Sequence, residues 1–264
     1  MNAPRYRTQG EPQHWTSAAE PELAVTTSGA VPAREVTRAV RAIGLILRRH
    51  RLDTAARVRV TAPAAADEPT LVQANIRFRG IPTRVQVCGP GGFAVTFAAE
   101  RLDRQIDRLA TRRVRPWPDP ARPPLARVSE PRAVTRRKTC ALLMGSPREA
   151  AAVLDAMDYD AYLFTDAETG EDAVVHWADP TGIRLLRQRA THPPRGAGLA
   201  NSPAIEAHPD PAPVLRESDA AAGMCRAGLP FLFFTDARSG RGGLLYRRYD
   251  GDLAVVMPER REFH

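Results

Sequence analysis

Arginine side chains recur along one face of a segment that reads as an amphipathic helix, residues 32–51. Its apolar side chains follow spacings of four, three and four, which place them on one buried face. They are Val36, Val40, Ile43 and Leu47. The arginines project on the other side, with Leu45 among them. They are Arg34, Arg38, Arg41, Arg48 and Arg49. A planar guanidinium binds phosphate through paired hydrogen bonds and stacks on bases, so this row could bind a nucleic acid.

A second segment, residues 93–113, has the same two-sided composition. Its apolar side chains are Val95, Leu102, Ile106 and Leu109. Helical spacing predicts a second arginine row, and Arg113 lies beside it. The row consists of Arg101, Arg104, Arg108, Arg112 and Arg115. The strands between the two segments add further basic residues. They are Arg57 and Arg59, and the candidate phosphate ligands Arg77, Arg79 and Arg84.

The charge of the chain is unevenly distributed. The 264 residues carry a net charge of +8, and Lys138 is the one lysine among 38 basic residues. Residues 31–140 hold 23 basic and 9 acidic side chains, whereas residues 141–264 hold 13 and 18. A charged face on one helix is most simply a solvated surface. Two arginine rows in one strongly basic block favour binding to a polyanion, because like charges this dense otherwise destabilise the fold.

Alternating and helical patterns over residues 22–115 predict a β-α-β-β-β-α domain that positions both rows. Its strands are expected at 23–27, 56–61, 71–78 and 82–87. Residues 1–21 are polar and contain three prolines, so we expect a flexible tail without a signal peptide. No apolar run is long enough for a transmembrane helix. Three widely separated cysteines fit a reducing cytoplasm.

The second half of the chain contains an internal repeat. Leu163-Phe-Thr-Asp-Ala167, followed by Gly170, returns 70 residues later as Phe233-Phe-Thr-Asp-Ala237, followed by Gly240. Two proline-rich stretches, a linker at 116–138 and a spacer at 191–213, delimit the repeats at 139–190 and 214–264. The predicted fold class is therefore α+β, with two small tandem α+β repeats after the first domain.

Each repeat is predicted to form a short helix and then about three strands, a sheet barely stable by itself. We therefore expect the two copies to pack on each other as a pseudo-dimer. The residues expected at this interface are Tyr162, Phe164, Val175, Trp177, Phe233, Phe234 and Leu245.

Motifs for enzymatic chemistry are not visible. The chain lacks a P-loop, a nucleophile elbow, a zinc-protease helix and a dinucleotide-binding glycine motif. Its six histidines show no ligand spacing. Asp166 and Glu168 could form an acid–base dyad, but the second copy has Asp236 and Arg238, so a turn-forming aspartate is the simpler interpretation. We expect no catalytic residue, no metal and no cofactor. Without a zinc finger, an aromatic RNA-binding motif or a helix-turn-helix, recognition of folded RNA by shape and phosphate fits best.

Several motifs resemble those of ribosome hibernation promoting factors, the S30AE or sigma-54 modulation family. Glu100-Arg-Leu-Asp-Arg-Gln-Ile106 is similar to the second-helix signature of that family's N-terminal domain. Residues 157–170 and 244–251 resemble the C-terminal domain of the long-form factors. Three features depart from the family pattern. Pro90-Gly91-Gly92 replaces the family's acidic lead-in to the second helix. Thr96 stands at a position where the family has a helical aspartate, and the usual long form has one C-terminal domain rather than two.

The resemblance implies a function on the ribosome. The N-terminal domain would bind the 30S subunit, within the 70S ribosome, where mRNA and tRNA normally bind. Both helices would contact 16S rRNA and translation would be repressed under stress or dormancy. The arginine-rich composition and the duplicated C-terminal domain are most similar to those of dormancy- and hypoxia-associated actinobacterial members. Neither a membrane nor a small-molecule substrate is expected as a partner.

Two other functions stay open on the sequence alone. One is a sequence-nonspecific DNA- or RNA-binding transcription modulator, and the other is an enzyme with an unrecognised site. The duplicated C-terminal domain also predicts the oligomeric state. In single-copy relatives the C-terminal domain pairs with that of another molecule, but each chain here carries both partners. Tethering gives an effective concentration on the order of millimolar, so the prediction is a monomer with an intramolecular pseudo-dimer.

Overall fold

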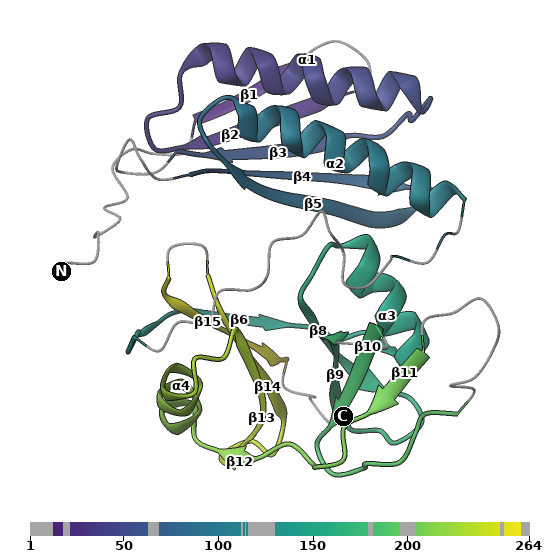
Figure 1. The fold of residues 1–264 in the computed structure, drawn as a ribbon, viewed down its shortest axis with the longest axis vertical. Coiled ribbons are helices and arrows are strands. Elements are labelled where there is room, and N and C mark those ends of the chain that lie inside the picture. The colour runs from purple at the N-terminus through teal and green to yellow at the C-terminus, as the bar shows by residue number, and fades with distance from the viewer. Residues whose placement is uncertain are drawn as a thin grey trace. The chain divides into compact units, whose positions relative to one another are not determined.

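The computed structural model describes residues 13–17, 22–62, 69–111, 113, 115, 130–178, 182–195, 204–248 and 251–259. Contacts divide the chain into two units, shown in Figure 1. The first comprises Met1–Arg113 with Ala156–Asp158, and the second comprises Val114–Asp155 with Tyr159–His264. None of the described helices is long and apolar enough to cross a membrane.

The first unit is a five-stranded sheet with two helices on one face (Figure 1). Its strands follow the chain order, and only β2 and β3 pair in parallel. They are β1 (Gln13–Ser17), β2 (Leu23–Ser28), β3 (Ala56–Thr61), β4 (Thr70–Phe78) and β5 (Ile81–Gly89). The helices are α1 (Ala33–Arg49) and α2 (Phe93–Ala110). This confirms the predicted β-α-β-β-β-α order from β2 onward. The strand β1 lies in the segment predicted as a tail, where it adds to the edge of β2.

The core of the first unit follows the predicted periodicities. Ile43 and Leu47 of α1 and Leu102 and Ile106 of α2 are buried in one cluster with alternate residues of the strands. On β3 the burial alternates, so that Arg57 and Arg59 are exposed between buried neighbours. The apolar stripes thus fix which face each helix turns to solvent.

The second unit contains two sheets and two helices (Figure 1). One sheet has the order β11-β10-β9-β8-β7, and the other has the order β12-β13-β14-β15-β6. The first repeat contributes β7 (Met144–Gly145), α3 (Pro147–Ala156), β8 (Ala161–Asp166), β9 (Asp172–Ala178) and β10 (Gly182–Arg187). The second contributes β12 (Val214–Leu215), α4 (Glu217–Arg226), β13 (Phe231–Asp236), β14 (Gly242–Arg247) and β15 (Leu253–Pro258). The remaining strands are β6 (Val134–Cys140) and β11 (Ala204–Ala207).

The two repeats exchange their first strands. β6 precedes the first repeat in the chain but pairs in parallel with β15 of the second. β11 precedes the second repeat but pairs in parallel with β10 of the first. The registers are equivalent after the 70-residue shift, since Arg184 pairs with Glu206 and Ala254 pairs with Arg136. Each five-stranded sheet is therefore complete only with a strand from the other repeat.

The strand exchange changes the predicted boundaries of the linkers. Residues 134–138 fall in the predicted linker and residues 204–207 in the predicted spacer, yet both segments are strands. Both are edge strands, and an edge position tolerates the polar composition that marked them as linker.

A hydrophobic cluster joins the two repeats, and it is built from equivalent positions. Buried Leu163 and Phe233 lie in it, as do Val174 and Leu244. Every other member also has its partner 70 residues away. These pairs are Leu142 with Ala212, Ala161 with Phe231, and Leu186 with Val256. The interface therefore has the self-complementary pattern of a two-fold dimer, formed within one chain.

At the centre of this interface an aspartate faces the glycine at its equivalent position. Asp172 is 2% exposed and accepts hydrogen bonds from the Gly242 N–H at 2.8 Å and from Arg241 Nε at 2.7 Å. A Cβ on Gly242 would lie 2.7 Å from the Asp172 Cβ, so only glycine fits there. Four residues further along β9, burial lowers the pKa of His176 to about 4, which keeps its ring neutral against Phe231.

The structure places most of the predicted interface residues elsewhere. Phe164, Val175 and Trp177 belong to the separate core of the first repeat, and Tyr162 packs against it. Phe234 and Leu245 belong to the core of the second repeat. Only Phe233 of the predicted set lies in the shared cluster. Successive side chains of a strand point to opposite faces, so the neighbours of the predicted residues form the interface.

Asp166 forms a turn, as the sequence predicted. Asp166 Oδ1 accepts the Glu168 backbone N–H at 2.9 Å, as expected of an Asx turn. Its other oxygen lies 2.6 Å from Arg187 Nε, in a pair that is almost fully buried. In the second repeat Met257 replaces this arginine, and Asp236 instead accepts the Ser239 N–H and hydroxyl.

Changing Gly242→Asp is expected to disrupt the pairing of the repeats. The new carboxylate would overlap Asp172 and place two like charges in a buried contact, which should lower the free energy of unfolding by about 3 kcal/mol or more. Urea denaturation of the full chain measures this loss. Gly223→Asp is the matched control, because a Cβ at Gly223 meets nothing within 4 Å. Equal stability of the two variants would contradict the importance of this contact.

Candidate nucleic-acid interface

The solvent-facing side of α1 carries the first predicted arginine row. Val36, Ile43 and Leu47 are buried against the sheet, so the arginines at intervening helical positions point outward. All five predicted residues are exposed. They are Arg34, Arg38, Arg41, Arg48 and Arg49. Arg41 and Arg48 form no hydrogen bond or ion pair with the described residues, so their guanidinium groups are available to phosphates.

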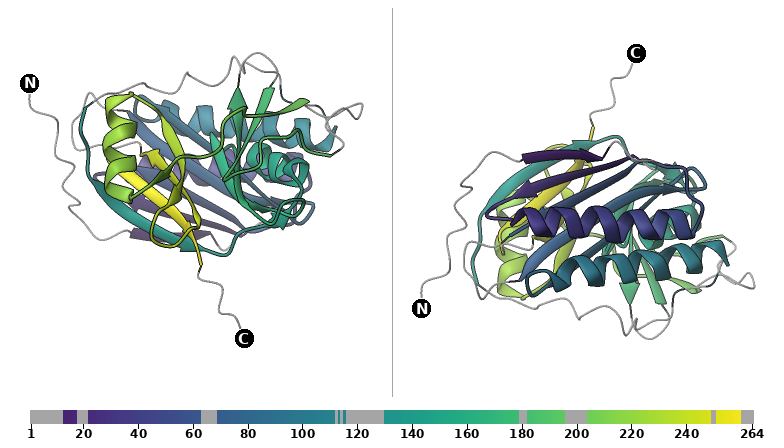
Figure 2. Two further views of the ribbon diagram at one scale, coloured as in Figure 1. Left: turned by 90° about the horizontal axis from the view of Figure 1, so that it is seen from below. Right: turned by 90° about the horizontal axis from the view of Figure 1, so that it is seen from above.

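The helices α1 and α2 lie side by side and run in the same direction (Figure 2, right). At their starts, the Arg38 guanidinium lies against Gly92, where any Cβ would overlap it. Glu35 is 3.3 Å from Arg38 and 3.8 Å from Arg34. The Arg38 and Glu35 side chains of α1 thus reach across to the start of α2.

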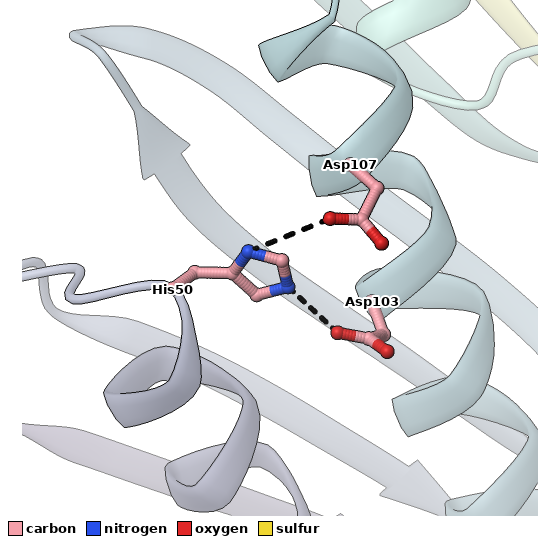
Figure 3. A group of neighbouring side chains, drawn as sticks. All are labelled: His50, Asp103 and Asp107. Atoms are coloured by element: carbon pink, nitrogen blue, oxygen red, sulfur yellow. Dashed lines mark hydrogen bonds and ion pairs between the residues drawn. The ribbon is translucent and has the colours of Figure 1, made fainter.

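At the other end, His50 bridges the two helices (Figure 3). His50 Nε2 lies 2.6 Å from Asp103 Oδ1, and His50 Nδ1 lies 3.8 Å from Asp107 Oδ1. Arg49 is 2.7 Å from the second oxygen of Asp103. This cluster fixes the end of α1 relative to α2, and so fixes the spacing of arginines on the two helices.

The His50 cluster is also the one group of described residues that could hold a metal ion, since its ligand atoms lie within 4.8 Å of one another. Asp103 already uses both oxygens, one with His50 and one with Arg49. This bonding makes the cluster a structural link between the helices. Sequence spacing could not find it, because His50 and Asp103 are 53 residues apart.

The second predicted row divides into residues with different environments. Arg104 is exposed on α2, and Arg113 is exposed beyond its end. Arg101 has a side chain only 12% exposed and lies 2.9 Å from Asp158, in the same unit. Arg108 donates to Gln105 Oε1 at 2.8 Å. Arg112 lies outside the described residues.

Arg115 lies in the second unit and not on α2, which ends at Ala110. Its side chain is 4% exposed and its Nε is 2.7 Å from Asp155 Oδ1. Its guanidinium also lies over the Trp177 ring, 5.5 Å from the centroid. Arg115 is therefore engaged within its own unit and is poorly placed to reach a nucleic acid.

The strand arginines lie at the β4–β5 hairpin. Arg77 is exposed and donates to the Gly80 carbonyl at 2.9 Å, and Arg79 is exposed over the Phe78 ring. Arg84 is half-buried and donates to Gln86. The exposed candidate arginines thus lie on α1, at Arg104 and at this hairpin.

Two exposed aromatic residues accompany the arginines, and their exposure was not predicted from the sequence. Phe93 and Phe97 of α2 are 65% and 42% exposed. Leu45 of α1, the one apolar residue in its arginine row, is 60% exposed. The candidate surface on α1 and α2 is therefore basic with apolar side chains interspersed.

Comparisons with known proteins identify a family model and two relatives that match this chain. The family model for "Sigma 54 modulation/S30EA ribosomal protein C terminus" matches residues 129–185, the span from β6 into β10. The chain is 44% identical over 254 residues to "Dormancy associated translation inhibitor" of Mycobacterium tuberculosis, in strain CDC 1551 / Oshkosh and in strain ATCC 25618 / H37Rv. Each alignment covers 94% of this chain and 92% of the relative.

Proposed function

The chain belongs to the S30AE/sigma-54 modulation family of ribosome hibernation factors, and from this premise we propose that it binds the small ribosomal subunit and represses translation. The first unit binds 16S rRNA through the exposed arginines of α1 and Arg104 of α2. It occupies the region where mRNA and tRNA would otherwise bind. The relative is named a translation inhibitor, which supports repression of translation as the effect of binding.

The observation that carries this proposal is the exposed arginine face of α1. Arg41 and Arg48 are seven residues apart, so they lie in one row along the helix. Arginine side chains on neighbouring parallel helices match the regular spacing of phosphates on a folded RNA. Recognition of this kind depends on backbone geometry and charge more than on base sequence.

Inhibition follows from occupancy in this proposal. In the Asp166–Glu168 pair, which could have served as an acid–base dyad, Asp166 is used in a turn and in a buried ion pair with Arg187. The second unit acts as a preformed pseudo-dimer. Since the chain supplies both halves of the interface, the protein is a monomer and leaves its ribosomes as single 70S particles.

Sedimentation with purified 70S ribosomes tests the proposal. We expect the full-length protein to pellet with 30S subunits and 70S ribosomes, and its affinity to fall steeply between 50 and 200 mM salt. Each phosphate contact releases condensed counterions, so several contacts together would lower the affinity by about a thousandfold over this range. Binding that is unaffected by salt, or preference for duplex DNA over ribosomes, would contradict the proposal and favour a transcription modulator.

A further inference from the structure

Phe93 and Phe97 form an exposed aromatic pair on the first two turns of α2. Their ring centroids are 6.3 Å apart and the ring planes differ by 27°. Among the described residues, they are the only aromatic side chains in the set of large, exposed apolar residues. Neither ring contributes to the core of the first unit, which α2 forms with Val95, Leu102 and Ile106. The Phe97 ring lies against Gly89 and is 42% exposed, whereas Phe93 is 65% exposed, so packing within the fold accounts for only part of this pair.

The pair continues the solvent-facing row of Arg104. Positions 93, 97 and 104 are separated by four and seven residues, which places them on one side of the helix. On the neighbouring helix, Arg38 lies against Gly92, one residue before Phe93. The aromatic pair thus has basic side chains on two sides, one from each helix.

We propose that Phe93 and Phe97 form a stacking platform for an unpaired base of rRNA, with Arg38 and Arg104 holding the flanking phosphates. This inference rests on the proposed ribosome binding and adds a contact that phosphate recognition alone does not supply. Each base of an RNA has an apolar face that stacks on aromatic side chains, and each nucleotide carries a phosphate for an adjacent arginine.

Charge favours RNA over an apolar protein surface as the occupant. The first turn of α2 carries no acidic residue, and the nearby Glu35 is shared between Arg34 and Arg38. Exposed Glu100 lies in the same row between Phe97 and Arg104, so the positive excess around the rings is that of Arg34, Arg38 and Arg104 over Glu35 and Glu100. A protein partner that covered the rings would also bury or pair these arginines. An unpaired nucleotide can both cover the rings with its base and pair the guanidinium groups with its phosphate.

Affinity for 70S ribosomes, measured with full-length protein over a salt series, tests the platform. Phe93→Ala/Phe97→Ala should weaken binding by on the order of tenfold for each ring lost, at every salt concentration. The slope of log affinity against log salt should stay unchanged, because no phosphate contact is removed. Phe93→Leu/Phe97→Leu should weaken binding nearly as much, and Phe93→Tyr/Phe97→Tyr should bind like the wild type.

A matched control and two contrary outcomes complete the test. Met144 and Val214 of the second unit are also exposed, at 62% and 68%, so Met144→Ala/Val214→Ala should keep wild-type affinity. Full affinity of the leucine variant would overturn the inference and indicate an apolar protein contact. Full affinity of the alanine variant would overturn it as well, since the rings would then contact nothing on the ribosome.

The same series separates this inference from the proposed function. Loss of binding on charge reversal at Arg41, Arg48 and Arg104, with full binding of the alanine variant, would overturn the platform alone. Full binding of both variants would overturn the ribosome-binding surface, and the platform with it. The thermal unfolding midpoint of every variant is measured first, and exposed positions such as these should leave it nearly unchanged.

Discussion

Reversing the charge of Arg41, Arg48 and Arg104 should nearly abolish ribosome binding while the protein stays folded. All three side chains are exposed, and none forms an ion pair with the described residues. Each glutamate replaces a phosphate contact by repulsion, so we expect at least about a hundredfold loss of affinity. The slope of log affinity against log salt should fall by about three. Co-sedimentation with 70S ribosomes over a salt series measures both quantities.

The control for this variant carries the same change in net charge. Arg136, Arg226 and Arg238 are exposed in the second unit, and their reversal to glutamate lowers the net charge of the chain equally. This control should retain most of the affinity. Equal loss in both variants would mean that overall charge, and not the surface of α1 and α2, drives binding.

A disulfide engineered between β6 and β15 should form within one chain. Thr139 and Met257 are paired across these strands. Cysteines at both positions, with the three native cysteines replaced by serine, should give an oxidised protein with the mass of one chain. Either single cysteine variant should form no such bond. Light scattering should report a monomer, and ribosomes bound by the protein should sediment as single 70S particles.

The opposite result would show exchange between molecules. If β6 of one chain completed the second repeat of another, oxidation would produce a covalent dimer on a non-reducing gel. Abundant 100S particles formed by this protein alone would also indicate pairing between two molecules. The intramolecular arrangement is favoured because Asp172 meets Gly242 in it. Pairing of two first repeats would instead bring two Asp172 carboxylates together, which is unfavourable.

The sequence predicted the first unit well because its signals are local. The apolar stripe of α1 determines which residues are buried, so the exposed positions of Arg41 and Arg48 follow from spacing alone. The row on α2 was predicted less well. Helical spacing was extended past Ala110, where the helix ends, and Arg101 is engaged by Asp158, 57 residues away. Long-range partners of this kind leave no local pattern.

The internal repeat was also visible in the sequence, but the packing of its two copies was not. Both faces of β8 and β13 are apolar, so composition could not distinguish the interface residue Leu163 from the core residue Phe164. Nor could it show which sheet β6 and β11 complete, because an edge strand carries a weak pattern. The aromatic pair was missed for a different reason, since a phenylalanine in a helix is usually read as core.

Titration of a cell-free translation system tests the central claim most directly. We expect inhibition to saturate near one protein per ribosome, with rRNA and mRNA intact, because a bound protein blocks the ribosome by occupying it. The charge-reversal variant of Arg41, Arg48 and Arg104 should leave translation active at the same ratio. Inhibition at far fewer proteins than ribosomes, cleaved RNA, or full inhibition by that variant would contradict the account.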